Sequence, residues 1–306
     1  MFSGLVIALL CPGQGAQSPG MLNDWLELDG ARERLQQWSE KADLDLIRLG
    51  TEAGAEEIRD TAITQPLTVA TSLLAAEYLP ETPSDAPVAG HSVGELAAAA
   101  IAGVLPAEDA VALAAVRGAA MAKACALEPT GMAAVMLGDP DEVVAWLAER
   151  DLEAANRNGA GQIVASGSAE AIERIVAEPM EGTKVRPLQV AGAFHTRYMA
   201  PAEEALRAHV ADLSPADPTR PLLSNADGAV VTGGAAYLER LVAQVTKPVR
   251  WDLTMQGLVG LDVTATAELP PAGTLSGLVR RELKGTVSSA VALKKPGDLD
   301  DLDPAA

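Results

Sequence analysis

Cysteine and histidine are both scarce in this sequence of 306 residues, which contains two cysteines and three histidines. Cys11 and Cys125 are too few for a disulfide framework and show no C-x-x-C spacing, so a reducing compartment is the simpler interpretation. The same scarcity argues against a zinc cluster, which needs several such ligands at close spacing. We therefore expect no metal site.

Long hydrophobic runs are also missing. Residues 1–11 are apolar, but no basic segment precedes them and the run breaks at Pro12, so they do not resemble a signal peptide and are expected to form a buried strand. The run over residues 96–105 ends at Pro106 and is too short to cross a bilayer. We therefore expect a cytoplasmic protein with no membrane partner.

Positive charge is in short supply. Lysine and arginine together number 23, against 42 aspartates and glutamates, which gives a formal net charge of −19. A broad nucleic-acid surface needs clustered basic side chains to contact phosphates, so we expect no nucleic-acid partner. An anionic partner would have to dock on a local basic patch. Two groups could supply one, namely Lys247 with Arg250, or Arg280 and Arg281 with Lys284.

Apolar residues make up 48% of the chain, enough to bury a sizeable core. Strands are expected at 5–10 and ending at 87–90, and a helix at 67–78. This alternation is typical of an α/β protein with a parallel sheet. A further helix is expected over 107–125, where apolar residues recur at helical spacing and place Arg117 on their face. A charge on that face needs a partner.

Residues 131–190 have a different pattern. They predict strand, helix, strand, helix and strand in turn, at 132–137, 139–149, 162–166, 169–177 and 184–190. With one strand still unplaced, this order indicates a small insert of the ferredoxin-like kind. We therefore expect a large catalytic domain over 1–130 and 191–293, a ferredoxin-like subdomain over 131–190, and a mobile acidic tail over 294–306.

Residues 90–94 read Gly-His-Ser-Val-Gly, a G-x-S-x-G sequence between an apolar segment and an alanine-rich helical one. The two glycines allow a tight strand-to-helix turn. That turn exposes the serine hydroxyl at the helix N-terminus, where a developing negative charge is stabilised. Ser92 is therefore the candidate nucleophile.

The base for Ser92 has to come from three histidines. His91 is adjacent to the nucleophile in the same turn, so its side chain is expected to point away, which favours a supporting or substrate-binding role. His209 falls in a helical pattern and is expected at the surface. His195 remains, in a glycine-containing segment between two elements. No acidic residue stands out as its partner; a backbone carbonyl could orient the ring instead, and the sequence leaves this open.

Arg117 and the first glycine-rich turn each allow two interpretations. Arg117 could pair with a surface carboxylate, or it could clamp a free carboxylate on an acyl group and so select a diacid. The turn after the first strand contains Gly13 and Gly15, but Ser18 stands in place of the third glycine of a dinucleotide fingerprint. Amide N–H groups exposed for an oxyanion are the better interpretation of this turn.

In this order, the segments closely resemble the malonyl-CoA:acyl-carrier-protein transacylases of bacterial type II fatty acid synthesis, particularly actinobacterial forms. The resemblance covers nearly the whole chain, and so many ordered matches are far more specific than any one. The matching segments are Pro-Gly-Gln-Gly at 12–15, Thr-Gln-Pro at 64–66, Gly-His-Ser-Val-Gly-Glu at 90–95, Arg-Gly at 117–118 with Met121, residues 156–162, Gly-Ala-Phe-His at 192–195, Ser-Asn at 224–225 and Pro-Val-Arg-Trp at 248–251.

The resemblance implies a fold and a catalytic set. The fold is an α/β-hydrolase-like core with a parallel sheet, carrying the ferredoxin-like subdomain. Ser92 would be the nucleophile and His195 its base, oriented by the main-chain carbonyl of Gln244. The backbone N–H groups of Gln14 and Val93 would form the oxyanion hole.

The same resemblance implies how the acyl group is bound. Arg117 would bind the malonyl carboxylate. In related polyketide acyltransferase domains a phenylalanine before the histidine goes with malonyl, so Phe194 favours malonyl as well. Further substrate contacts are expected from Gln65, His91 and Met121.

The predicted function is transfer of a malonyl group from malonyl-CoA, through an ester on Ser92, to the phosphopantetheine thiol of acyl carrier protein, with no cofactor. Three alternatives stay open: a serine esterase or thioesterase, a non-catalytic protein that only binds carrier protein, and a malonyl transferase serving a polyketide pathway. One segment departs from the family, since Leu-Pro-Pro-Ala-Gly at 269–273 stands where a Gly-Pro-Gly turn is usual. The resemblance therefore does not predict that loop.

Overall fold

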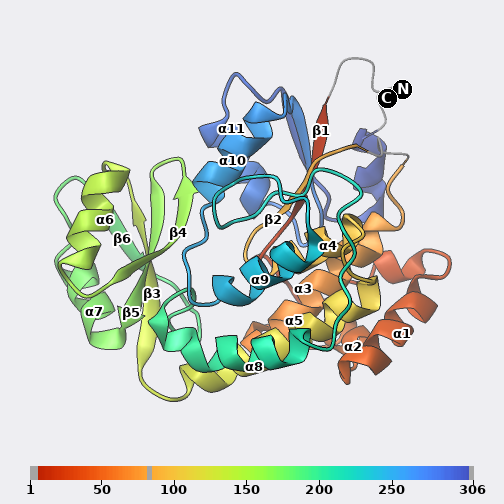
Figure 1. The fold of residues 1–306 in the computed structure, drawn as a ribbon, viewed down its shortest axis with the longest axis horizontal. Coiled ribbons are helices and arrows are strands. Elements are labelled where there is room, and N and C mark those ends of the chain that lie inside the picture. The colour runs from red at the N-terminus through yellow and green to blue at the C-terminus, as the bar shows by residue number, and fades with distance from the viewer. Residues whose placement is uncertain (1–5, 81–84, 303–306) are drawn as a thin grey trace.

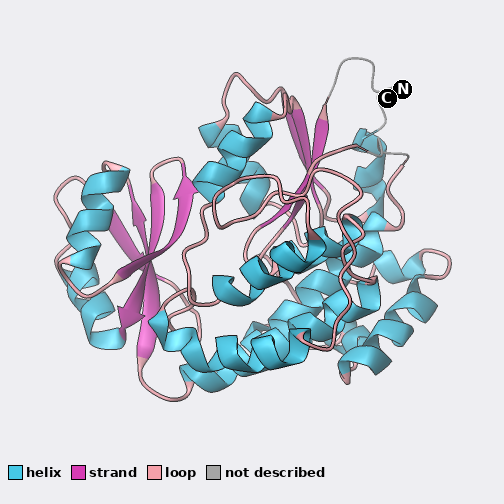
Figure 2. Cartoon of the chain, in the orientation of Figure 1, coloured by secondary structure: helices cyan, strands magenta, loops and turns pink. Residues whose placement is uncertain are grey.

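The strands of the protein form two separate sheets, one parallel and one antiparallel, in a computed structural model that describes residues 6–80 and 85–302. The two sheets lie on opposite sides of the molecule, with helices around both (Figure 1). Figure 2 shows that helices predominate and that each sheet is a compact block of strands. The fold is therefore mixed α/β, as the sequence predicts.

The parallel sheet has the strand order β2-β1-β7-β8, with every neighbouring pair parallel. Its strands are β1 (Ile7–Cys11), β2 (Val88–Gly90), β7 (Ala265–Glu268) and β8 (Ser289–Ala292). All five residues of β1 are buried, because helices cover both faces of the sheet. The sheet separates two hydrophobic cores, and Leu9 contributes to the larger and Leu10 to the smaller, as the two-residue period of a strand requires.

Most helices pack on the side of the larger core. They are α1 (Ala31–Ala42), α2 (Leu46–Thr51), α3 (Thr61–Ala76), α4 (Gly94–Ile101), α5 (Ala107–Cys125), α8 (Ala200–Val210) and α9 (Gly234–Gln244). The other face of the sheet is covered by α10 (Trp251–Gly260) and α11 (Thr274–Glu282). The described residues also contain four short 3-10 helices, η1 (Trp25–Glu27), η2 (Glu57–Arg59), η3 (Arg197–Met199) and η4 (Pro296–Leu302).

Helix α5 has the residues that its predicted range 107–125 requires. Pro106 precedes its first residue, Glu108 and Asp109 lie in its first turn, and Lys123 lies in its last, which complements the helix dipole. Gly118 allows α5 to approach α3 closely, because a Cβ there would lie 2.5 Å from the carbonyl oxygen of Thr61. This approach brings the middle of α5 against the first turns of α3.

The antiparallel sheet has the strand order β4-β5-β3-β6. Its strands are β3 (Thr130–Met136), β4 (Glu153–Gly159), β5 (Gln162–Ser168) and β6 (Lys184–Pro187). Helices α6 (Pro140–Ala148) and α7 (Ala169–Ala177) cover its outer face and enclose a third hydrophobic core (Figure 1). The strand left unplaced by the sequence is β4, whose residues Glu-Ala-Ala-Asn-Arg-Asn-Gly have low β-propensity.

Strand β4 also ties the antiparallel sheet to the rest of the molecule. The N–H of Arg157 donates to the carbonyl of Val249 at 2.9 Å, and the N–H of Val249 donates to the carbonyl of Ala155 at 2.8 Å. At the end of the strand, a carboxylate oxygen of Glu282 on α11 accepts the N–H of Ala160. The edge of this sheet is therefore held beside the N-terminus of α10.

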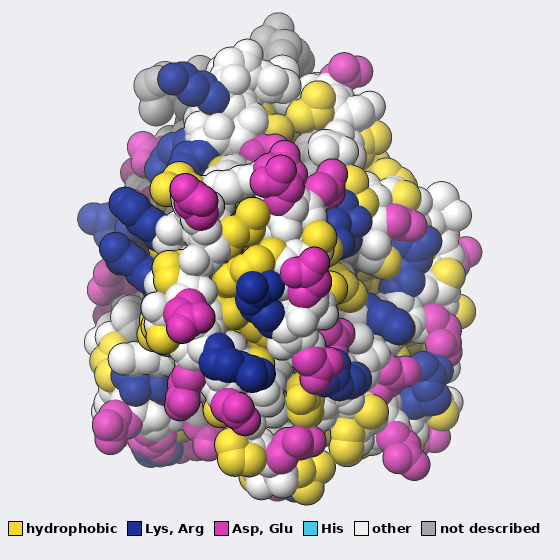
Figure 3. Space-filling view, turned by 90° about the vertical axis from the view of Figure 1, so that its left-hand side faces the viewer, with side chains coloured by type: hydrophobic (Ala, Val, Ile, Leu, Met, Phe, Trp, Pro, Cys, Tyr) yellow, Lys and Arg dark blue, Asp and Glu magenta, His cyan; other side chains and the backbone are white. Residues whose placement is uncertain are grey.

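The face of the molecule over α6, α7 and β6 carries both signs of charge (Figure 3). Lys184 and Arg186 on β6 are exposed basic residues, and Glu170 and Glu178 at the two ends of α7 are exposed acidic ones. The excess of acidic residues in the sequence is therefore not expressed as a continuous acidic surface on this face.

The segments at the C-terminal end differ in detail from expectation. Residues 294–306, predicted as a mobile tail, include η4, whose Leu302 is buried; residues 303–306 lie outside the described part. In the loop 269–273 the Pro270–Pro271 peptide bond is cis. The carboxylate of Glu268 then accepts the N–H groups that begin α11.

Across residues 6–80 and 85–302, no helix has the length and apolar character needed to cross a bilayer.

Candidate active site

Ser92 lies in a strained turn between β2 and α4. Its φ of 54° is in the left-handed region that non-glycine residues rarely adopt. The flanking glycines are required by close backbone contacts. A Cβ on Gly90 would lie 2.1 Å from the carbonyl carbon of Gly94, and one on Gly94 would lie 2.2 Å from the carbonyl oxygen of Cys11. The turn therefore tolerates no side chain at either glycine and presents Ser92 at the start of α4.

Asn225 holds this turn from the other side. Its Oδ1 accepts the N–H of Ser92 at 2.8 Å, and its Nδ2 donates to the carbonyl of Gly90 at 2.7 Å. The Asn225 side chain is fully buried. Ser-Asn at 224–225 carries part of the family resemblance, but the sequence predicts no role for Asn225, because nothing local to these residues places them beside Ser92.

His195 lies within hydrogen-bonding distance of Ser92. Its Nε2 is 2.8 Å from the Ser92 Oγ, and its Nδ1 is 2.8 Å from the carbonyl oxygen of Gln244. A carbonyl can only accept a hydrogen bond, so Nδ1 carries the proton and Nε2 is free to accept one from the serine. Burial, followed by the positive charge of Arg117, lowers the pKa of His195 to about 3. The ring is therefore neutral at pH 7, the form in which a base can take a proton.

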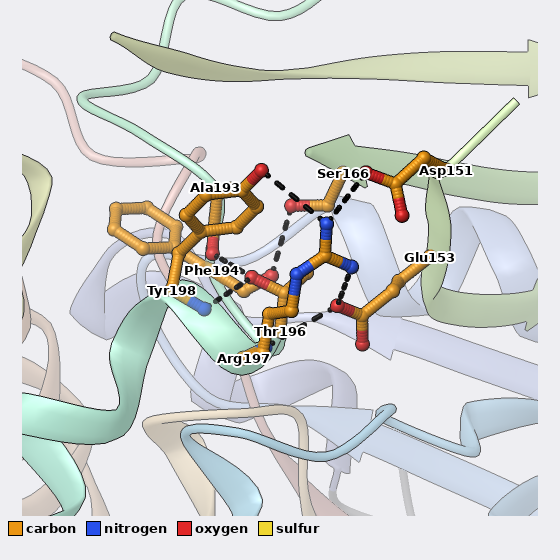
Figure 4. Close-up of polar contacts among 8 residues, drawn as sticks. All are labelled: Asp151, Glu153, Ser166, Ala193, Phe194, Thr196, Arg197 and Tyr198. Atoms are coloured by element: carbon orange, nitrogen blue, oxygen red, sulfur yellow. Dashed lines mark hydrogen bonds and ion pairs between the residues drawn. The ribbon is translucent and has the colours of Figure 1, made fainter. Parts of the chain in front are cut away.

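The segment that carries His195 is anchored on both sides (Figure 4). The Thr196 hydroxyl donates to the carbonyl of Ala193 at 2.7 Å, and the Ser166 hydroxyl on β5 donates to the carbonyl of Phe194 at 3.1 Å. Arg197 forms ion pairs with Asp151 and Glu153 next to β4. His195 itself has a φ of 60°. The surrounding bonds thus hold a strained residue in place, as strained residues at functional sites require.

Arg117, on α5, also reaches Ser92. Its guanidinium donates to Gln65 Oε1 at 2.7 Å, to Gln244 Oε1 at 3.0 Å and to Ser92 Oγ at 3.3 Å. The side chain is 2% exposed, and burial lowers the pKa of Arg117 to about 10, so it remains a cation at pH 7. Among the described residues its Nε–H has no acceptor and no carboxylate forms an ion pair with it. A buried cation that is bonded only to neutral groups can accommodate an anionic ligand.

Two backbone N–H groups next to the Ser92 turn and the first glycine-rich turn have no acceptor among the described residues. In the described ranges, no hydrogen bond is made by the N–H of Gln14, in the turn after β1, or by the N–H of Val93, which follows Ser92. Both are therefore available as oxyanion donors.

The predicted substrate contacts converge on one cavity of about 550 Å³. It is lined by Ser92, His195, Arg117 and Gln14, together with Gln65, His91, Met121 and Phe194. Gln65 donates to Gln14 Oε1 and lies 3.4 Å from the Met121 sulfur. His209 lies on α8 and does not line this cavity.

The His91 side chain contacts residues of β4 and α10. Its Nε2 lies 3.0 Å from Asn158 Oδ1, and its ring packs edge-on against Trp251 with 5.5 Å between centroids. Burial lowers the pKa of His91. It therefore joins the turn to β4 as a neutral residue at the cavity wall.

The comparisons with known proteins agree along almost the whole chain. Residues 8–298 match the family model described as acyl transferase domain. Relatives named malonyl CoA-acyl carrier protein transacylase from Mycobacterium bovis and Mycobacterium tuberculosis are each 56% identical over 301 residues, covering 97% of this chain and 99% of the relative. A crystal structure of MCAT from Mycobacterium tuberculosis is 57% identical with a TM-score of 0.92, covering 97% of this chain and 99% of that one.

A more distant structure adds a bound partner. It is a malonyl-transacylase in complex with a type II PKS acyl-carrier protein, 28% identical with a TM-score of 0.88, covering 96% of this chain and 97% of that one.

Proposed function

The chain belongs to the acyl transferase family, and we propose that it moves a malonyl group from malonyl-CoA to acyl carrier protein through an ester on Ser92. The observation that carries the proposal is the position of the Ser92 Oγ, 2.8 Å from a neutral imidazole and 3.3 Å from the guanidinium of Arg117. A nucleophile, its base and a counter-ion for a carboxylate thus meet at one atom.

The first half of the reaction acylates the serine. The proton of the Ser92 hydroxyl passes to Nε2 of His195 as Oγ attacks the thioester carbonyl carbon. The resulting tetrahedral oxyanion would accept hydrogen bonds from the N–H groups of Gln14 and Val93, which have no other acceptor in the described residues. The carbon–sulfur bond then breaks, and coenzyme A leaves with the proton held by His195.

The second half runs through the same groups in reverse. The phosphopantetheine thiol of acyl carrier protein gives its proton to His195 and attacks the ester carbonyl, and Ser92 leaves as an alcohol. Support for this acceptor comes from the partner bound to the distant structural neighbour, a type II PKS acyl-carrier protein. The same neighbour keeps service to a polyketide pathway open as an alternative.

Arg117 would select the acyl group. The malonyl carboxylate is two carbons from the ester oxygen, so it would lie close to a guanidinium that already contacts Oγ. The Nε–H, which has no acceptor in the described part of the chain, and the neutral partners Gln65 and Gln244 leave the charge of Arg117 available. Phe194 lines the cavity with His195, and its ring would limit the room for larger acyl groups, as a malonyl preference requires.

We also propose the domain division expected from the sequence, with an α/β-hydrolase-like domain over 1–130 and 191–293 and a ferredoxin-like subdomain over 131–190. The chain order β3-α6-β4-β5-α7-β6 supports the latter, since it is the β-α-β-β-α-β order of that motif. The strand-turn-helix around Ser92 at the end of a parallel strand supports the former.

The test of the proposed function is the amount of coenzyme A released when the protein is mixed with malonyl-CoA and no thiol. We expect a burst of one coenzyme A per chain and then a stop, with turnover restored by adding acyl carrier protein. Continuous release without a thiol would indicate an esterase or thioesterase. No release at all would indicate a non-catalytic protein.

A further inference from the structure

A buried carboxylate lies behind the site and has no role in the mechanism above. Glu95, in the first turn of α4, is 1% exposed. One of its oxygens accepts the N–H of Asn225 at 2.6 Å, and the other accepts Nε2 of Gln244. Among residues 6–80 and 85–302 it forms no direct ion pair. Both of its oxygens therefore face donors, which is the environment of an ionised carboxylate.

The amide of Gln244 joins this carboxylate to Arg117. Its Nε2 donates to Glu95, and its Oε1 accepts from Arg117 at 3.0 Å. A carboxylate has only acceptors and a guanidinium only donors, so the two ends of the amide can satisfy both in one orientation only. Above the raised pKa of Glu95, a buried anion and a buried cation are thus separated by a single neutral group.

We propose that Glu95 is a positioning residue for acyl selection. Glu95 fixes the orientation of the Gln244 amide by accepting its Nε2. When ionised, it also supplies a negative charge that offsets the positive charge of Arg117 across the Gln244 amide, and it leaves the guanidinium free to bind the acyl carboxylate. The inference rests on the proposed function, because it concerns how Arg117 receives a malonyl group. Were the carboxylate in direct contact with Arg117, it would compete with that group for the same donors.

Replacing Glu95 by glutamine removes this fixed orientation. The N–H of Asn225 is a backbone donor and cannot turn, so the introduced amide would place its oxygen there and its NH₂ toward Gln244. Either two NH₂ groups then face each other, or the Gln244 amide turns over and presents its NH₂ to Arg117. In every arrangement a donor faces a donor, and Arg117 is held less well.

The experiment compares kcat/KM for malonyl-CoA and for acetyl-CoA, which lacks the distal carboxylate. Burial raises the pKa of Glu95 to about 8, and the Asn225 N–H and the charge of Arg117 oppose that rise. The assays are therefore made above pH 8, where Glu95 is ionised. We expect Glu95→Gln to lower the malonyl-to-acetyl ratio about tenfold. An unchanged ratio, or a raised one, would overturn the positioning role.

The matched control is Glu268→Gln. Glu268 is also fully buried and accepts the N–H groups of Gly273, Leu275 and Ser276, but it does not line the cavity. This variant should lose stability and keep the wild-type ratio. If both variants changed the ratio equally, the effect would be one of general stability, and the proposal would fail.

A second variant keeps the test decisive if Glu95→Gln does not fold. In the double variant Glu95→Gln with Gln244→Glu, the carboxylate introduced at position 244 accepts from both Arg117 and the amide introduced at position 95, so the two main contacts are kept. Only the 3.4 Å contact from Gln244 to Asn225 Oδ1 is lost. We expect it to fold and to have a lower ratio than wild type, because its carboxylate contacts Arg117 directly. A double variant with the same malonyl-to-acetyl ratio as the wild type would overturn the proposal. The proposed function itself would be refuted by a different result, namely that the wild-type protein forms no malonyl ester.

Discussion

The carbonyl oxygen of Gln244 lies 2.8 Å from Nδ1 of His195, in the position that a carboxylate occupies in hydrolase triads. A neutral acceptor orients the ring but stabilises its protonated form less than a carboxylate does. With burial and Arg117 acting in the same direction, the pKa of His195 falls to about 3. The sequence leaves open what orients His195, and this carbonyl is the group that lies within hydrogen-bonding distance of its Nδ1.

The pH dependence of folding should report this neutral histidine. The unfolded chain takes up a proton on His195 below its ordinary pKa of about 6.5, whereas the native state does so only near 3. His195 therefore contributes stability above pH 6.5, and that contribution is lost as the pH falls. Between pH 7 and pH 5 the loss is about 2 kcal/mol. We expect His195→Asn to show a correspondingly smaller drop in the free energy of unfolding, measured by urea denaturation at both pH values.

The comparison has to be made between variant and wild type at each pH. Glu95, with a raised pKa, changes stability in the opposite sense, since its contribution is lost as the pH rises toward 8. The wild-type curve alone would therefore mix the two residues. An identical drop in both proteins would show that His195 takes up its proton at an ordinary pKa in the native state.

Removal of the guanidinium should change acyl preference. Arg117→Ala takes away the cation that contacts the Ser92 Oγ, and hydrogen bonds to charged groups contribute about 1.5–3 kcal/mol. We expect the malonyl-to-acetyl ratio of kcat/KM to fall by about tenfold to one hundredfold. Lys123→Ala, an exposed change on the same helix, is the control and should keep the ratio. A variant at 117 that still preferred malonyl as strongly as wild type would rule out the clamp.

Gly90 and Gly94, which flank Ser92, should tolerate no added methyl group. In Gly90→Ala the new Cβ would lie 2.1 Å from backbone atoms of Gly94, so either the turn opens or the core shifts, at about 1–3 kcal/mol or more. Gly54→Ala is the control, because apart from residue 54 and its two chain neighbours no described atom lies within 4 Å of that Cβ. Thermal unfolding of both variants measures the difference. Equal melting temperatures would contradict the close contact on which the turn depends.

Local sequence patterns predicted the elements that are built from strong local signals. The range of α5 was predicted as found, since its apolar period, acidic first turn and Pro106 all agree. Ser92, His195 and Arg117 could be singled out because a reactive serine needs a base and a buried charge needs a partner. Strand β4 was missed because alanine, asparagine and glycine give no strand signal, and its place depends on contacts with Val249 and β5.

The buried polar residues that support the Ser92 turn could not be predicted from local sequence patterns. Asn225 and Glu95 are separated by 130 residues in the chain, and Gln244 and Glu95 by 149, yet they bond to one another behind Ser92. Buried polar residues such as these show no role in sequence, because their partners are supplied only by tertiary packing. Their exposure of 0% for Asn225 and 1% for Glu95 is the signal that a structure adds.

Acylation of Ser92 can be tested by the intact mass of the protein after mixing with malonyl-CoA, followed by peptide mapping. We expect one added malonyl group, located on the peptide that contains Ser92 and absent from Ser92→Ala. His195→Asn, mixed in the same way, should acquire the group far more slowly. A malonyl group that still appeared on Ser92→Ala, or that mapped to another residue in the wild type, would contradict the role of Ser92 as the nucleophile.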